Sequence, residues 1–121
     1  MNDKTTTVAD VKAAITEFVD ERDWSQYHDP KSLVLAIASE VGELADHFRW
    51  LTREESFEVI KDPADAKAIA NELADVIMFA LEFASVCKID ISTAVEDKLR
   101  INAEKYPVDK AKGSKLKYDR L

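Results

Sequence analysis

The chain has 121 residues, of which 46% are hydrophobic and 34% are charged, with only two glycines and three prolines. This length suffices for one domain with a modest core, and the composition is typical of a helical globular protein. The formal net charge of −7 argues against non-specific binding to nucleic acid or to anionic membranes. No apolar run is long enough to span a bilayer, and a single cysteine fits a reducing compartment, so we expect a cytoplasmic protein.

The first two helices are predicted by capping residues and by apolar periodicity. After a short N-terminal segment (residues 1–6), Thr7 is a suitable N-cap for the first helix, and a polar break at residues 23–30 follows. The second helix, about residues 31–51, has the clearest helical period in the chain. Its apolar residues recur in steps of three and four: Val34, Ile37, Val41, Leu44, Phe48 and Leu51. This spacing puts them on one helix face.

Capping patterns predict two further helix starts. Thr52 and Glu55 have the spacing of a capping box, which predicts a short helix after Thr52. Asp62 followed by Pro63 is typical of an N-cap with proline at the first helical position. We therefore expect a third main helix to begin there and to run to about residue 88.

The third main helix is apolar on nearly every side between residues 76 and 86. A helix with this pattern is normally buried on every side. In so short a chain, a second covering surface most easily comes from another subunit. The pattern therefore predicts an obligate homo-oligomer.

A fourth main helix is expected to start at Asp90 or Ser92 and to end before Pro107. A basic C-terminal tail, residues 108–121, follows, and contacts within the oligomer are a possible source of order for it. The sequence shows no strand alternation, internal repeat or low-complexity tract. We expect an all-α, four- to five-helix, bundle-like single domain over residues 1–121.

Two acidic motifs lie within runs that are otherwise strongly apolar: Glu40-Val-Gly-Glu43 and Glu72-Leu-Ala-Asp75. A spacing of three residues puts both acids of a pair on the same side of a helix, here beside the apolar face. Antiparallel packing of the two helices would bring four carboxylates around one cavity. Ionised carboxylates leave water only when their charge is compensated. An all-oxygen set suits Mg²⁺, with Mn²⁺ as an alternative.

Two other interpretations of these acids have less support from the sequence. A single acidic pair on a helix is usually a solvated face, but two pairs that each border a core stripe make this explanation weaker. A di-iron bundle uses the Glu-x-x-His motif. Here His47 lies four residues after Glu43, and no histidine follows the second motif, so iron is disfavoured.

A third group of polar and aromatic residues suggests ligand contacts. Asn102 projects into the apolar arc of the fourth helix, with Lys98 one turn before it. The amide could cap a neighbouring loop or read the edge of a base, with Lys98 at a phosphate. Trp50 on the acidic flank and Trp24 in the break could stack on a base or pack in the core. His28 is interpreted as a surface or packing residue.

Together these motifs resemble the all-α nucleoside triphosphate pyrophosphatases of the MazG-like superfamily, and most closely their short dCTP pyrophosphatase-like branch. The resemblance covers about residues 18–118, and the order of the motifs makes it specific. The strings that carry it are Glu21-Arg22-Asp23-Trp24, His28-Asp29-Pro30, Ser39-Glu40-Val41-Gly42-Glu43-Leu44-Ala45, Phe48-Arg49-Trp50, Glu72-Leu73-Ala74-Asp75-Val76, Ile101-Asn102 and Lys105-Tyr106-Pro107.

The resemblance implies Mg²⁺-dependent cleavage of a nucleoside triphosphate to a monophosphate and pyrophosphate, as a house-cleaning activity on the nucleotide pool. The implied metal-binding and catalytic acids are Glu40, Glu43, Glu72 and Asp75. The implied nucleotide contacts are Trp24, Trp50, Phe79, Lys98 and Asn102. It also implies subunits paired as dimers or as a dimer of dimers, with sites near an interface.

Two positions depart from the resemblance. Ile15 stands where close relatives carry a histidine, and Phe79 stands where they carry a tyrosine, so base and sugar preference cannot be transferred directly. Phe79 can stack on a base but cannot donate a hydrogen bond. We expect deoxyribonucleoside triphosphates as substrates, dCTP first, with dATP or other dNTPs as alternatives. The alternative is a non-catalytic helical oligomer that binds a nucleotide or a protein, but such a module has no need for two acidic pairs.

Overall fold

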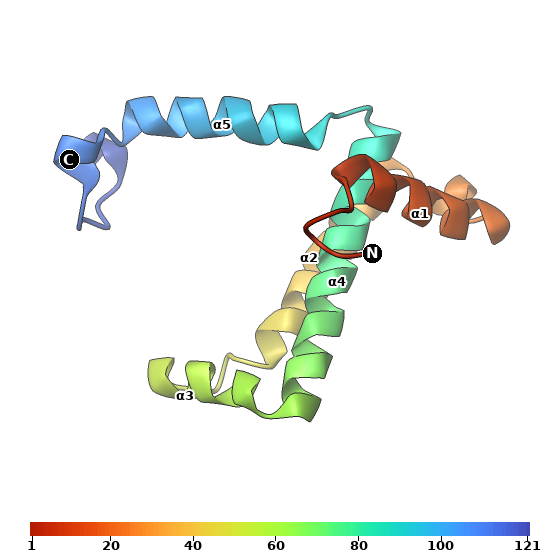
Figure 1. Ribbon diagram of the computed structural model, residues 1–121, viewed down its shortest axis with the longest axis horizontal. Coiled ribbons are helices and arrows are strands. Elements are labelled where there is room, and N and C mark those ends of the chain that lie inside the picture. Colours follow the sequence, from red (N-terminus) through yellow and green to blue (C-terminus); the bar gives the residue numbers. More distant parts are fainter. The chain divides into compact units, whose positions relative to one another are not determined.

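A computed structural model describes all residues from 1 to 121, and every regular element in it is helical (Figure 1). The all-α prediction is therefore confirmed. The chain consists of two compact units, Met1–Lys88 and Ile89–Leu121. None of the helices combines the length and the apolar character needed to cross a lipid bilayer.

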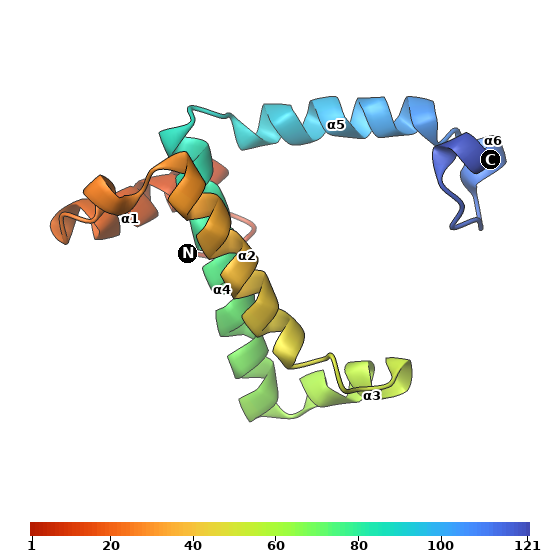
Figure 2. The ribbon, with the colours of Figure 1, turned by 180° about the vertical axis from the view of Figure 1, so that it is seen from behind.

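The first unit is built around one antiparallel helix pair. Its α-helices are α1 (Val8–Glu21), α2 (Pro30–Asp46), α3 (Arg53–Glu58) and α4 (Pro63–Val86), and 3₁₀ turns lie at Ser25–Tyr27 and Val59–Lys61. The α2 and α4 helices run side by side in opposite directions, which both views show (Figures 1 and 2). The α1 helix also contacts α4. The two helices that carry the acidic motifs are thus direct neighbours.

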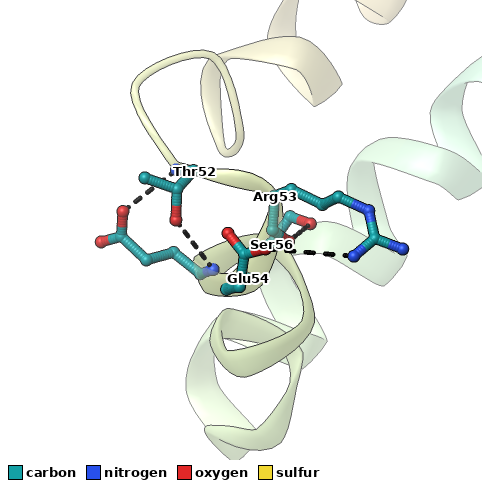
Figure 3. A network of polar contacts seen from close by, with 5 residues as sticks. Thr52, Arg53, Glu54 and Ser56 are labelled. Atoms are coloured by element: carbon teal, nitrogen blue, oxygen red, sulfur yellow. Dashed lines mark hydrogen bonds and ion pairs between the residues drawn. The ribbon is translucent and has the colours of Figure 1, made fainter.

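The helix starts predicted from capping residues are confirmed. The Thr7 side chain accepts a hydrogen bond from the backbone N–H of Asp10, which begins α1. At α3 the Thr52 hydroxyl accepts from the N–H of Glu55 at 3.2 Å, and the Glu55 carboxylate accepts from the N–H of Thr52 at 3.0 Å (Figure 3). Asp62 accepts from two backbone N–H groups at the start of α4. These bonds satisfy amides that have no partner within the helix.

The α2 helix differs from its predicted range of 31–51. It begins at Pro30, where Asp29 is the N-cap, and it ends at Asp46. The apolar period continues to Phe48 and beyond, but there the backbone tightens, and the N–H of Phe48 donates to the carbonyl of Ala45. The chain must then become extended at Thr52 to cap α3. The position where α2 ends is therefore set by the start of α3, and not by the end of the apolar period.

The core of the first unit lies where α1, the start of α2 and the end of α4 meet. The buried apolar residues are Ile15, Val19, Leu33, Leu81 and Ala84. The helix pair also exposes large apolar side chains, among them Val34, Leu35, Val41, Leu73 and Ile77. Leu73, in the middle of α4, is 50% exposed. Within one chain, α4 is therefore not covered on all sides.

The second unit contains the fourth main helix and the segment that was expected as a basic tail. The α5 helix (Ile91–Lys105) begins after Asp90, whose side chain accepts from the N–H of Thr93. A short helix, α6 (Val108–Ala111), and a 3₁₀ turn at Tyr118–Arg120 follow. The ring of Tyr118 packs edge-on against Tyr106, with 6.1 Å between the ring centroids. The tail thus contains local structure of its own.

Candidate active site

Three carboxylates from two helices converge between α2 and α4. Glu40 and Glu43 come from α2, Glu72 comes from α4, and one oxygen from each lies within 4.8 Å of the other two. We call these three residues the acidic cluster. Residues three apart on a helix share a face, so α2 presents both of its acids to its antiparallel neighbour. The sequence prediction that the two motifs meet across these helices is therefore confirmed for these three acids.

Glu40 combines a raised pKa with a buried carboxylate oxygen, which distinguishes it within the acidic cluster. Burial is the main factor that raises its pKa above the ordinary value, and the negative charges of Glu43, Asp75 and Glu72 raise it further. Its Oε2 atom is buried and has no hydrogen-bond donor. A buried carboxylate oxygen normally has a donor or a cation beside it. Glu40 therefore marks the place where a positive ligand would be most stabilising.

Glu72 shows the same kind of perturbation from the opposite helix. Burial raises its pKa first, followed by the charge of Glu43, a side-chain hydrogen bond with Glu43, and the charge of Asp75. His47 opposes this effect, with its Nε2 atom 3.9 Å from Oε1 of Glu72. One imidazole at this distance cannot offset the charge of several acids. The acidic cluster consequently holds excess negative charge.

The donor atoms of the acidic cluster fit a divalent cation. All three side chains offer carboxylate oxygen, which hard cations such as Mg²⁺, Mn²⁺ and Ca²⁺ prefer. The oxygen of Glu40 without a donor and the raised pKa values are what clustered acids show when nothing compensates them. No cysteine or second histidine accompanies the group, so a zinc-type site is not indicated.

Asp75, the fourth acid of the two motifs, lies beside the acidic cluster and is not a member of it. It is one turn further along α4 than Glu72 and close enough to raise the pKa values of both Glu72 and Glu40. Asp75 also lines an adjacent cavity. It therefore connects the charged group to the apolar part of the site.

The cavity beside Asp75 is mostly apolar and has a volume of about 250 Å³. It is lined by Ile15, Phe18, Val19, Trp24, His28, Asp75, Met78, Phe79 and Glu82. The residues from α1 follow an i, i+3, i+4 pattern, and those from α4 follow i, i+3, i+4, i+7. Each helix therefore contributes one continuous face. The cavity lies entirely within the first unit.

Trp24 reaches the cavity because of the turn that ends α1. Asp23 adopts a left-handed backbone conformation with φ of 53°. The N–H of Trp24 donates to the carbonyl of Val19, and the N–H of Asp23 donates to that of Asp20. This hydrogen-bond pattern is a Schellman motif, which brings the residue after the turn back against the last helical turn. Trp24 consequently packs edge-on against Phe18, with 5.8 Å between the ring centroids.

Two polar residues face each other in the cavity wall. Nδ1 of His28 lies 3.3 Å from Oε1 of Glu82, and both side chains are largely buried. His28 directly precedes Asp29, the N-cap of α2, and Glu82 lies near the end of α4. The second carboxylate oxygen of Glu82 is buried and has no hydrogen-bond partner.

The remaining predicted contact residues occupy different surroundings. Phe79 lines the cavity, whereas Trp50 is 82% exposed in the turn after α2, with the guanidinium of Arg49 over its ring at 4.9 Å. Lys98 and Asn102 lie on α5 in the second unit, the first exposed and the second half-buried. The roles of Trp50, Lys98 and Asn102 stay predictions.

Glu82 is absent from the site residues predicted from the sequence, and His28 was predicted to be a surface or packing residue. A signal for Glu82 was present, because it is the only charged residue in the apolar stretch 76–86. An acid in a helix segment expected to be buried on all sides needs a donor or a ligand. The partner could not be found from the sequence, because His28 is 54 positions away.

Comparison with known proteins gives concordant matches. A profile of the MazG-like family matches residues 35–121. Human dCTP pyrophosphatase 1 is 39% identical over 115 residues, which make up 95% of this chain and 68% of that protein. The bovine dCTP pyrophosphatase 1 is 38% identical over the same extent. A crystal structure of a pyrophosphatase from Archaeoglobus fulgidus superposes with a TM-score of 0.74 and 36% identity, covering 78% of this chain and 87% of that one.

Proposed function

Because the chain belongs to the MazG-like family, we propose that it is a nucleoside triphosphate pyrophosphatase that converts dCTP and related nucleotides to the monophosphate and pyrophosphate. Such an activity removes triphosphates from the nucleotide pool. The observation that carries the proposal is the acidic cluster, with its buried oxygen that lacks a donor, directly beside a cavity of about 250 Å³. The single cysteine favours a reducing compartment, and we place the enzyme in the cytoplasm.

The acidic cluster is the proposed binding site for Mg²⁺, with Mn²⁺ as a substitute. Glu40, Glu43 and Glu72 supply the carboxylate oxygens, and Asp75 adds negative charge beside them. A bound divalent cation supplies Lewis-acid stabilisation of charge on the triphosphate and lowers the pKa of water. The donor set and its uncompensated charge support this assignment.

The protein's own carboxylates are proposed to accept the proton that the attacking water releases. Water attacks phosphorus, the bond between the α- and β-phosphates breaks, and the proton of the water passes to a carboxylate. Glu40, Glu43, Glu72 and Asp75 are the candidate acceptors, because they border the place where the phosphates would lie. Asp75 stands between the acidic cluster and the cavity.

The base of the nucleotide is proposed to enter the apolar cavity. Trp24 and Phe79 offer aromatic faces there, and base–aromatic stacking contributes about 1–3 kcal/mol per base. Lys98 is proposed to meet a phosphate, and Asn102 and Trp50 to contact the base or sugar. These three assignments rest on the sequence resemblance.

We further propose that the enzyme works as a homo-oligomer, a dimer or a dimer of dimers. The support is the set of large apolar side chains that α2 and α4 leave exposed, such as Leu35, Leu73 and Ile77. Pairing this surface with a second copy would complete a helical bundle and bury α4 on all sides. Light scattering of the purified protein tests the mass directly. A monomer at micromolar concentration would contradict this assembly.

The decisive experiment for the function is a pyrophosphate-release assay with purified protein. The four dNTPs and four NTPs are compared side by side, each with Mg²⁺, with Mn²⁺ and with excess chelator. We expect metal-dependent release of pyrophosphate and monophosphate, fastest with dCTP. Failure to hydrolyse any triphosphate in the presence of metal would refute the proposal. Release of orthophosphate instead would show cleavage at a different bond.

A further inference from the structure

Glu82, one of the side chains that line the cavity beside the acidic cluster, has one carboxylate oxygen that the protein does not satisfy. Glu82 is only 7% exposed, and its Oε1 atom lies 3.3 Å from Nδ1 of His28. Its Oε2 atom is buried and has no donor. Leaving a buried acceptor without a partner is costly. This oxygen is therefore suited to accept a hydrogen bond from a ligand that enters the cavity.

A purely structural role explains only half of this arrangement. A buried acid paired with a histidine is costly to desolvate, and an apolar side chain of similar volume would often be as stable. The neighbours of Glu82 on α4 that line the cavity, Met78 and Phe79, are apolar. The contact with His28 holds one oxygen in place and leaves the other for a ligand.

The size and lining of the cavity indicate which part of a nucleotide it takes. Its volume of about 250 Å³ is below the roughly 300–1,000 Å³ of pockets that enclose a whole ligand. Trp24 and Phe79 supply flat aromatic faces, and no lysine or arginine lines the wall. Phosphates therefore do not fit this environment, whereas a single nucleobase does.

We propose that Glu82, held in place by His28, reads the exocyclic amino group of the base and makes the enzyme select cytosine over uracil and thymine. The inference rests on the proposed function and specifies its substrate. The N4 amino group of cytosine donates hydrogen bonds, and carboxylates are its usual acceptors in proteins. Uracil and thymine carry a carbonyl oxygen at the same position. That oxygen would face the carboxylate of Glu82 without a hydrogen between them.

The first test changes the substrate and leaves the protein intact. Wild-type enzyme is assayed with dCTP, with dUTP, and with the 2-pyrimidinone analogue, which has hydrogen in place of the 4-amino group. We expect kcat/KM to fall at least about tenfold from dCTP to dUTP, with the analogue between them. Similar values for all three would overturn the inference while leaving the pyrophosphatase function standing. Absence of hydrolysis for all three would instead refute the function itself.

The second test changes Glu82. In Glu82→Gln the amide can turn its NH₂ group toward a carbonyl, so the preference for dCTP over dUTP should fall by about tenfold or more, mainly through KM. The matched control is Glu17→Gln, an exposed acid on α1 that does not line the cavity, which should keep the wild-type ratio. Thermal unfolding checks that both variants are folded. An unchanged ratio in folded Glu82→Gln would overturn the inference, and the analogue series decides it if that variant does not fold.

Discussion

Carboxylates at the helix N-termini and carboxylates between α2 and α4 have pKa values that are shifted in opposite directions. At the helix starts, Asp10, Asp29 and Glu55 accept hydrogen bonds from backbone N–H groups, and these bonds are the main reason that their pKa values are lowered. In the acidic cluster, burial and neighbouring carboxylates raise the pKa values of Glu40 and Glu72. The same chemical group is thus stabilised as an anion in one region and destabilised in the other.

This difference distinguishes acids that cap helices from acids that are suited to bind a ligand. A capping acid finds its donor within three residues, so its charge is satisfied as soon as the helix forms. The acids of the cluster meet through tertiary packing and find mainly one another. The protein keeps an unfavourable concentration of charge there, as functional sites commonly do. Four measurements can test whether the two kinds of acid really differ in this way.

The largest effect is expected from neutralising an acid of the cluster. Glu40→Gln should lower kcat/KM for dCTP by about 100-fold or more at fixed metal concentration. Changes in residues that only support metal ligands already cost about 10- to 100-fold, so a ligand should cost at least as much. The matched control is Glu55→Gln at a helix start, which should keep nearly full activity. Equal losses of kcat/KM in both variants would show that acids of the cluster and acids at helix starts do not differ in function.

A divalent cation should stabilise the folded protein, and this effect should depend on pH. At neutral pH, Mg²⁺ at about 100 times its Kd should add about 2.7 kcal/mol to the free energy of unfolding. The folded pKa values of Glu40 and Glu72 lie above the ordinary 4.5. Protons therefore compete with the cation as pH falls through these raised values, and the gain should vanish near pH 4.5. Thermal unfolding with Mg²⁺ and with chelator measures this difference.

The metal-free protein should show the opposite trend for these two acids. Because the folded state holds their protons more tightly than the unfolded state does, their contribution to stability is present below pH 4.5. It is lost as pH rises through the raised folded pKa values. A stabilisation by Mg²⁺ that did not change with pH would argue that the cation binds elsewhere.

A smaller effect is expected at the start of α4. Asp62 accepts hydrogen bonds from the N–H groups of Ala64 and Asp65, so Asp62→Ala should lower the free energy of unfolding by about 1 kcal/mol. Asp62→Asn preserves the acceptor and should behave like the wild type. Chemical denaturation measures both variants, and kcat/KM should remain close to wild type in each. A loss of activity without a loss of stability would place Asp62 in the site.

The smallest effect is expected from neutralising an acid of the cluster in the absence of metal. In chelator at neutral pH, Glu72→Gln should have an unfolding midpoint equal to or slightly above that of the wild type. The substitution removes repulsion with Glu43 and Asp75, although it also removes the contact with His47. A clear drop in the midpoint would mean that Glu72 serves mainly as a structural partner of His47.

Much of the fold and part of the site follow from short-range patterns. The starts of α1, α3 and α4 were predicted from Thr7, Thr52 and Asp62, because a cap and its backbone donors lie within three residues. The shared face of Glu40 and Glu43 follows from helix geometry in the same way. The end of α2 was placed too late, because apolar period continues past the residue where the backbone tightens.

The sequence by itself determined where the main helices begin and which acids lie on a common face, since both depend on neighbours a few positions away. Tertiary structure decided which of these faces meet. It brought Glu72 to Glu40 and Glu43, set Asp75 beside them at the cavity wall, and joined Glu82 to His28 across 54 positions. Contacts of this kind arise from the way that α1, α2 and α4 pack, and the burial that perturbs these carboxylates exists only once the helices have packed.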